Sequence, residues 1–411
     1  MSQERISAKL LFLLLMGIGF CLPAFNRQPT HTLIALSAVV AIWHVVVTAA
    51  WRRWDGADYA MTALLCSAII SNLTNWRTAV GVSQGVFEWL AYWSSFMAIR
   101  HSAIAPARLR SLAVTLVAGG LIGLVLAVWD AVQTSRSFEL PGVRGTIRSS
   151  LYVGMLLVLS IGFSMTCRGW KRLTWLGIAL LLAAALLALS SRAVIIASCL
   201  ALAVAFWWFS RRQFVALIAV SLTVAVIAWS FLPLDQKSRF AYKTRELVEL
   251  VGKGRITAND EIRIETWRVA WAWIRRGEHI SFGIGPRSFH LIDTEKLNLH
   301  PPLVHQESKQ MSHAHNLFLT IYIEQGVFGL AALLAFIGMA IWRLWKCRQM
   351  VRIEWSWWGA WAALVLILVN GMVGSPWSRE YAWLASTLIA IHFARSSPSP
   401  KPITEPSQGK S

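Results

Sequence analysis

The sequence predicts an all-α polytopic membrane protein with about twelve transmembrane helices and a large, partly helical external loop between the ninth and the tenth. Of its 411 residues, 56% are hydrophobic, and the mean hydropathy is +0.53, far above the usual value for a soluble domain. Apolar runs of membrane-spanning length recur along the chain. The connections between them alternate between rich and lean in Lys and Arg, which is typical of a chain that crosses a bilayer repeatedly.

The expected helices form two groups separated by a polar segment. Residues 1–232 hold the first group, and 233–313 form the loop domain with amphipathic helices. Residues 314–395 hold the second group, and 396–411 form a disordered tail rich in Pro and Ser. The expected spans are residues 8–25, 31–50, 58–73, 79–99, 109–132, 149–167, 172–189, 193–209, 213–232, 315–342, 355–374 and 380–395.

The positions of Lys and Arg predict which connections are cytoplasmic, because short cytoplasmic loops carry more of them. One alternating set of connections is basic and includes both termini. The leaner set includes the 233–313 segment, so we expect that segment outside and both termini in the cytoplasm. The basic set contains Arg52, Arg53, Arg100, Arg108, Arg110, Arg168, Lys171, Arg172, Arg211, Arg212, Arg343, Lys346, Arg348 and Arg352.

The formal net charge of +19 favours anionic partners such as phosphates and lipid headgroups. In a soluble protein this charge would indicate nucleic acid. Here the cytoplasmic loops explain much of the excess, so we expect no nucleic-acid partner. The five cysteines are scattered in or beside apolar runs and predict neither a disulfide framework nor a CxxC metal site.

The external segment has helical periodicity at residues 240–251 and at about 260–276. The second stretch is rich in Trp on one face and is flanked by Arg, which is typical of a helix that lies flat at a membrane interface. Its apolar face comprises Ile264, Trp267, Trp271 and Ile274. The glycines of Phe282-Gly-Ile-Gly285 stop short of a nucleotide-binding GxGxxG pattern and predict a tight turn.

The polar segment ends in Met-Ser-His-Ala-His-Asn, where two histidines stand directly before an apolar helix. Neither His313 nor His315 is needed to start that helix, because Ser312 or Asn316 can cap it. Three interpretations are open for His313 and His315. Both are ordinary loop residues, or both bind a metal with His300 or His305 as a third ligand, or one of them is an acid–base catalyst. No HExxH pattern supports a metal, and we expect none. An ordinary imidazole pKa of about 6.5 suits a neutral base outside the cytoplasm.

The helix after His315 carries further signs of a built site. Gly326 and Gly329 would let another helix approach closely. Glu324 lies more than two turns into the predicted span, where a carboxylate is costly and usually faces a partner or a wet cavity. Both an interhelical polar contact and a role in the active site stay open for Glu324.

Arginines on the external side are the second signal. Arg192 stands between two apolar runs with almost no loop around it, on the side where topology does not require a positive charge. It either snorkels to headgroups or binds an anionic substrate, and we favour the substrate. Guanidinium forks match phosphate oxygens, so several beside one histidine indicate a pyrophosphate leaving group. The other external arginines are Arg144, Arg148, Arg263, Arg287 and Arg379.

The spacing of these features carries a resemblance. His315-Asn316 is followed by the nine residues 317–325 and then by Gly326-Val-Phe-Gly329. With Ser191-Arg192, Arg263-x-x-x-Trp267 and Phe282-Gly-Ile-Gly285, this order resembles the O-antigen ligase family, whose superfamily includes O-antigen polymerases and protein O-oligosaccharyltransferases. Leu330 follows the second glycine where ligases often have Thr, which leaves ligase and polymerase both open.

The resemblance implies a membrane-embedded, GT-C-like glycosyltransferase in a bacterial inner membrane, with a periplasmic active site. The implied donor is O antigen on undecaprenyl pyrophosphate, and the implied acceptor is a sugar hydroxyl of lipid A–core oligosaccharide. The implied reaction is inverting and needs no metal, cofactor or ATP. Catalysis would rest on His315 with His313 adjacent, and pyrophosphate binding on Arg192 and Arg263. We add two helpers to the pyrophosphate site, Arg148 and Arg287.

Other functions stay open at this stage. A lipid or oligosaccharide transporter would be favoured by broken helices and midplane charges, whereas the ionisable residues here concentrate at one external face. A structural scaffold would leave the histidines and arginines unexplained. A polymerase or a protein O-oligosaccharyltransferase would use the same site with another acceptor.

Overall fold

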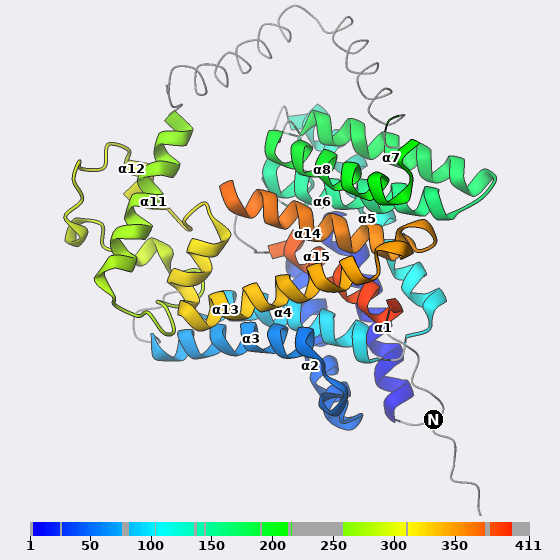
Figure 1. Ribbon diagram of the computed structural model, residues 1–411, viewed down its shortest axis with the longest axis horizontal. Helices are drawn as coiled ribbons and strands as arrows, with labels where there is room; N and C mark the ends of the chain where they lie inside the picture. Colours follow the sequence, from blue (N-terminus) through cyan, green and yellow to red (C-terminus); the bar gives the residue numbers. More distant parts are fainter. Residues whose placement is uncertain are drawn as a thin grey trace, which may run out of the picture.

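The computed structural model describes residues 3–24, 27–75, 82–102, 104–134, 138–143, 145–189, 191–212, 215, 258–309, 311–374 and 379–396. Every regular element in these ranges is a helix. Long helices pack side by side into a bundle, and a smaller helical lobe with α11 (Ala258–Arg276) and α12 (Gln306–Lys309) stands beside one end of it (Figure 1). The predicted span 213–232 and the predicted helix 240–251 lie outside the described residues.

Each predicted span other than 213–232 coincides with a helix of the bundle. The helices are α1 (Gln3–Ala24), α2 (Arg27–Val47), α3 (Gly56–Thr74), α4 (Val82–His101), α5 (Pro106–Thr134), α6 (Thr146–Thr166), α7 (Trp170–Ala188), α8 (Arg192–Phe209), α13 (Leu317–Lys346), α14 (Trp355–Val373) and α15 (Arg379–Ser396). Among the described residues, seven helices are long and apolar enough to cross a membrane: α1, α5, α6, α7, α8, α13 and α14. The chain is therefore a multi-pass membrane protein.

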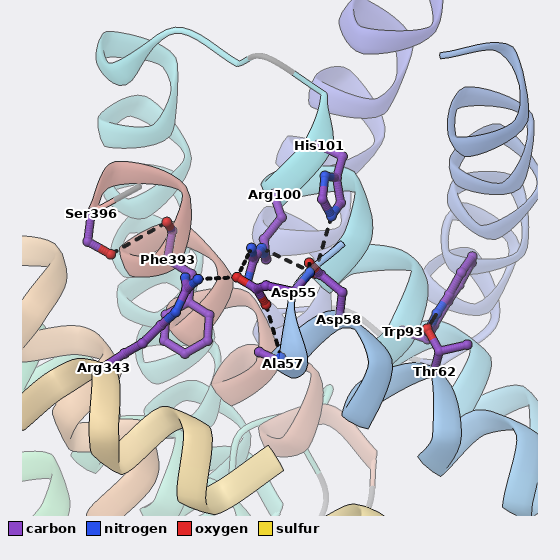
Figure 2. A network of polar contacts seen from close by, with 10 residues as sticks. All are labelled: Asp55, Ala57, Asp58, Thr62, Trp93, Arg100, His101, Arg343, Phe393 and Ser396. Carbon is purple, nitrogen blue, oxygen red and sulfur yellow. Dashed lines mark hydrogen bonds and ion pairs between the residues drawn. The ribbon is translucent and has the colours of Figure 1, made fainter. Parts of the chain in front are cut away.

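Charged side chains join several helices at one end of the bundle, which we call the basic end (Figure 2). Asp55 caps α3 by accepting the backbone N–H of Ala57. Its carboxylate also pairs with Arg100 at the end of α4, at 2.9 Å, and with Arg343 near the end of α13. Arg100 lies 3.2 Å from the fully buried Asp58. Burying a charge is costly unless it is paired, so these contacts fix the depth at which the three helices meet.

The same end collects other basic connections. Arg395, in the last turn of α15, pairs with Glu354 before α14 and donates a hydrogen bond to the carbonyl of Pro106 at the start of α5. The helices therefore alternate in direction, and the connections predicted to be cytoplasmic share one end. Which side of a membrane this end faces stays a prediction.

The opposite end, which we call the site end, is tied together by neutral hydrogen bonds. The Asn316 side chain donates to the Met372 carbonyl at 3.0 Å, which joins the start of α13 to the end of α14. Asn75, at the end of α3, donates to the Gly283 carbonyl at 2.9 Å. The small lobe is thus attached at the site end, where α13 begins.

Candidate active site

The two histidines before α13 lie in a tight local structure. The rings of His313 and His315 meet edge to face, with their centroids 4.4 Å apart. The backbone N–H of His315 donates to Nδ1 of His313 at 3.2 Å. His315 has a φ of +50°, a backbone conformation that L residues rarely adopt. One imidazole therefore helps to hold the strained backbone that presents the other.

The helix behind the histidines starts at Asn316, one of its two predicted caps. Asn316 is the N-cap of α13, and its side-chain oxygen accepts the N–H groups of Phe318 and Leu319. Ala314, fully buried between the histidines, donates its N–H to the hydroxyl of Thr320 at 3.2 Å. The bonds to Asn316 satisfy backbone N–H groups of the first helical turn that have no partner within the helix. The bond from Ala314 holds the loop residue that precedes the helix. His315 therefore stands at a fixed place on the rim of the bundle.

The surroundings of His315 favour its neutral form. Burial of the half-buried imidazole, with the positive charge of Arg263 on α11 acting in the same direction, lowers the pKa of His315 to about 4. At neutral pH the ring is therefore a proton acceptor. The structure brings the two predicted site residues His315 and Arg263 together although they are far apart in the sequence.

Helix α11 is anchored to the loop that leads to the histidines. The buried carboxylate of Glu265 accepts the N–H groups of Val304 and His305, at 2.7 and 3.1 Å, and the hydroxyl of Ser308 at 2.6 Å. Burial disfavours the charged carboxylate, but these hydrogen bonds outweigh it and hold the pKa of Glu265 below its ordinary value. The anchor keeps Arg263, which lies half a turn away on α11, in a fixed position.

Helix α11 has apolar side chains both inside the lobe and on its surface. Val269 and Ala270 are buried against a small core with Phe289 and Ile323, whereas Ile264 and Trp271 are 38% and 54% exposed. The helix therefore buries its small residues in the lobe and leaves larger apolar groups outside. Its placement at a membrane interface stays a prediction.

Helix α13 bends at Gly326, and the loop after α11 fills the bend. Gly326 has φ +70° and ψ −168°, a region that only glycine visits readily. The N–H groups of Ile284 and Gly285 donate to the carbonyls of residues 323 and 324, both at 2.9 Å, and Val327 donates to the Ile280 carbonyl at 2.8 Å. The loop thus replaces the helical hydrogen bonds that the bend breaks. A Cβ on either Gly283 or Gly326 would collide with the opposing backbone.

This arrangement corrects the prediction for Gly326 and explains the predicted turn at Gly283 and Gly285. Gly329 faces another helix as predicted, near Ser67 of α3, but Gly326 receives a loop instead of a helix. The predicted tight turn at Gly283 and Gly285 exists, and its purpose is to pair with the bend in α13.

Glu324 holds the same loop through hydrogen bonds to its backbone. Its buried carboxylate accepts the backbone N–H groups of Arg287 and Phe289, and its carbonyl accepts the Ser71 hydroxyl. The Arg287 side chain in turn lies 3.6 Å from Glu88 on α4. The side-chain oxygens of Glu324 thus accept hydrogen bonds that shape the loop. The guanidinium of Arg287 lies beside the Glu88 carboxylate, which offsets its positive charge.

Substituting Gly326 with Ala should destabilise the protein and impair its activity. The added Cβ meets the Ser281 backbone at a glycine-only φ, which should cost about 3 kcal/mol or more. Gly338→Ala on the same helix is the matched control, because nothing lies within 4 Å of its added Cβ and Ala favours helix. Thermal unfolding in detergent compares them, and equal melting temperatures for the two variants would contradict this account of the bend.

The remaining predicted arginines lie at the site end. Along α8 and α14, Phe206 meets Trp358, Ala201 meets Trp361, and a Cβ on Gly154 of α6 would meet both Val194 and Leu366. The two helices therefore run in opposite directions, and Arg192, the first residue of α8, lies toward the end of α14 that carries Met372. Since Gly162 of α6 lies against Trp358, the start of α6 with Arg148 is at this end too.

The predicted arginines thus differ in how they are placed relative to His315. Arg263 acts directly on His315, and Arg287 shapes the loop at the bend. Arg192 and Arg148 share the end of the bundle with them, on other helices. Arg144 and the side chain of Arg379 lie outside the described residues.

The other histidines have separate contacts. His305 lies 3.2 Å from Glu261, and His279 stacks on Trp273 with a centroid distance of 6.2 Å. Within the described part of the chain, no group of three or more His, Cys, Asp or Glu is placed to hold a metal ion. His300 and His305 therefore do not complete a ligand set with the histidine pair in these residues.

Sequence reasoning missed two polar residues that build the site, Glu88 and Glu265. Glu88 carried a usable signal, because it is an acidic residue inside an expected span, as Glu324 is. Glu265 carried none, since a carboxylate on an amphipathic helix usually lies on its solvated face.

Comparison with protein families gives one match. Residues 176–334 match the family model described as O-antigen ligase. The match runs from α7 through α8 and α11 to the middle of α13, so it contains Arg192, Arg263, the histidine pair and the Gly326 bend. No curated protein matches the chain significantly.

Proposed function

We propose, because this chain belongs to the O-antigen ligase family, that it transfers O antigen from undecaprenyl pyrophosphate to a sugar hydroxyl of lipid A–core. The reaction would take place on the periplasmic side of a bacterial inner membrane. The observation that supports it most is a neutral, half-buried His315 held beside Arg263 at the end of a membrane-embedded bundle. A base and a fixed positive charge at one membrane surface suit transfer from a lipid-linked pyrophosphate.

The proposed reaction is a single displacement. The His315 imidazole takes the proton of the acceptor hydroxyl, whose oxygen forms a bond to the anomeric carbon. The bond from that carbon to the pyrophosphate oxygen breaks, and undecaprenyl pyrophosphate leaves with the electron pair. Attack from the face opposite the leaving group inverts the anomeric configuration. Because the pyrophosphate linkage is already activated, the proposed transfer uses neither ATP nor a metal.

His315 is a better candidate for the base than His313. Nδ1 of His313 already accepts the backbone N–H of His315, so part of its acceptor capacity serves the local fold. The strained backbone at His315 fits a residue whose position is set for function. We assign His313 the task of orienting this backbone.

Two arginines are assigned to the leaving group. Arg263 is electrostatically coupled to His315, so a pyrophosphate that it binds would lie close to the base. Arg192 begins α8, where the helix dipole adds to the attraction of its side chain for an anion. Arg148 stays a possible helper at the same end. Arg287 is a weaker candidate than the sequence suggests, because its guanidinium faces Glu88.

Complementation tests the choice of acceptor. Expression in a cell that lacks its O-antigen ligase should restore long-chain lipopolysaccharide, whereas expression in a polymerase-deficient cell should not restore long chains. The reverse result would identify a polymerase, and failure in both cells with normal membrane expression would count against both enzymes and favour a transporter.

Arg192→Lys should lower the transfer rate about tenfold or more while the protein remains folded. The ammonium retains the charge but loses the fork that binds two phosphate oxygens. Arg212→Lys, just beyond the other end of α8, is the matched control and should be active. Initial rates at varied donor concentration measure the effect, and an unchanged rate for Arg192→Lys would argue against bidentate pyrophosphate binding.

A further inference from the structure

A second charged surface lies at the basic end. Helix α13 runs from beside the lobe with α11 and α12 to this end (Figure 1). We call this surface the tryptophan–arginine patch. It combines the end of α8, the end of α13 and the short helix η4 (Arg348–Arg352), which packs against α8. Its basic members are Arg211, Arg212, Lys346, Arg348 and Arg352, and its aromatic members are Trp207, Trp342 and Trp345.

Each tryptophan of the patch carries a cation over its ring. Arg211 lies 4.9 Å from the ring centre of Trp207, Lys346 lies 5.0 Å from that of Trp342, and Arg348 lies 5.2 Å from that of Trp345. The three rings are 49%, 53% and 55% exposed. Such stacking holds long basic side chains in place at little cost.

The positive charge of the patch is not neutralised within the described residues. No salt bridge there involves any of its five basic side chains, and the neighbouring carboxylate of Glu354 is paired with Arg395 at 2.6 Å. Two further carboxylates of this end, Asp55 and Asp58, lie against Arg100, and Asp55 also pairs with Arg343. An anion from outside the protein would therefore meet cations that are not paired with any carboxylate of the described residues.

The partner must be both anionic and partly apolar. Exposed Trp rings favour the boundary between lipid headgroups and acyl chains, and Ile353, 76% exposed beside Arg352, adds an apolar group at the same place. Free phosphate would use the cations but not the rings. We propose that this patch binds the phosphodiester headgroup of an anionic phospholipid, with the rings beside the upper acyl chains.

Phosphatidylglycerol is the probe for this proposal. The protein is purified in neutral detergent, phosphatidylglycerol or phosphatidylcholine is titrated in, and native mass spectrometry counts the bound lipid. Each basic residue near an anionic lipid surface contributes about 1 kcal/mol, or about fivefold in affinity. The triple variant K346Q/R348Q/R352Q should therefore bind phosphatidylglycerol about a hundredfold more weakly than the unmodified protein.

A matched control separates a site from general surface charge. R168Q/K171Q/R172Q removes the same charge from the connection between α6 and α7 and the first turn of α7, where none of these three cations has a described contact with a ring, and should bind as the unmodified protein does. Equal loss in both triple variants, no loss in the first, or equal binding of phosphatidylcholine would overturn the proposal. Should the first triple variant not fold, K346Q against K171Q makes the same comparison, with fivefold loss expected only for K346Q.

Discussion

Replacing His315 with Ala should lower the rate of glycan transfer by about 10²- to 10⁴-fold, the usual contribution of a general base. The ring is half-buried at the surface of the site end, and α13 is capped by Asn316, so the fold should survive the loss of the imidazole. The measurement is the initial rate of transfer by purified protein, beside a thermal unfolding curve that shows the variant is folded.

His305→Ala is the matched control for this experiment. His305 belongs to the same loop, and its imidazole contacts Glu261. The His305→Ala variant should transfer glycan at nearly the rate of the unmodified protein. His313→Ala should have an intermediate effect, because it removes the acceptor that holds the His315 backbone but leaves the base in place. Full activity of His315→Ala, or an equal loss in His305→Ala, would remove His315 from the mechanism.

The low pKa of His315 gives the same residue a pH signature. A base with a pKa of about 4 is already deprotonated at mildly acidic pH, so kcat/KM should stay level from about pH 7.5 down to about 5.5. A histidine with the ordinary pKa of about 6.5 would lose about tenfold over the same range. Such a fall in the unmodified protein would contradict the environment described for His315.

The second large effect is expected at Arg263. Arg263→Gln should lower transfer by about 10²- to 10³-fold, as the loss of one donor to a developing negative charge does. The substitution removes the guanidinium that would balance the charge on the leaving pyrophosphate. Arg275→Gln is the control, because Arg275 lies on the same helix and is exposed at its far end. Equal activities of the two variants would contradict the role of Arg263.

Arg263→Gln should also change the pH profile in a defined direction. The positive charge of Arg263 helps to lower the pKa of His315, so its removal should raise that pKa and move the acid limb of kcat/KM upward. Burial is the larger cause of the low pKa of His315, and it remains in this variant. The acid limb should therefore still lie below the ordinary histidine pKa. A residue that only bound the donor would change the rate without this shift.

The sequence predicted the bundle well because hydrophobic length and loop charge are local signals. Every expected span within the described residues is a helix, and the basic connections meet at one end. The start of α13 was also predictable, since Asn316 at an apolar boundary is a typical N-cap. These features depend on neighbouring residues only.

The site was predictable in its members but not in its grouping. Nothing local connects Gly283 with Gly326, and their need for each other appears only when the loop backbone fills the bend in α13. Likewise, Arg263 and Arg287 look equivalent in the sequence. The structure separates them, because Arg263 acts on His315 whereas Arg287 faces Glu88. Long-range packing decides which arginine is available to a substrate.

The most direct measurement uses the purified protein with lipid-linked O antigen and lipid A–core, in the presence of a chelator and without ATP. We expect the glycan to be joined to lipid A–core with inverted anomeric configuration, and His315→Ala to abolish the product. Elongation of the lipid-linked glycan without transfer to lipid A–core, or retention of configuration, would contradict the proposed ligase mechanism.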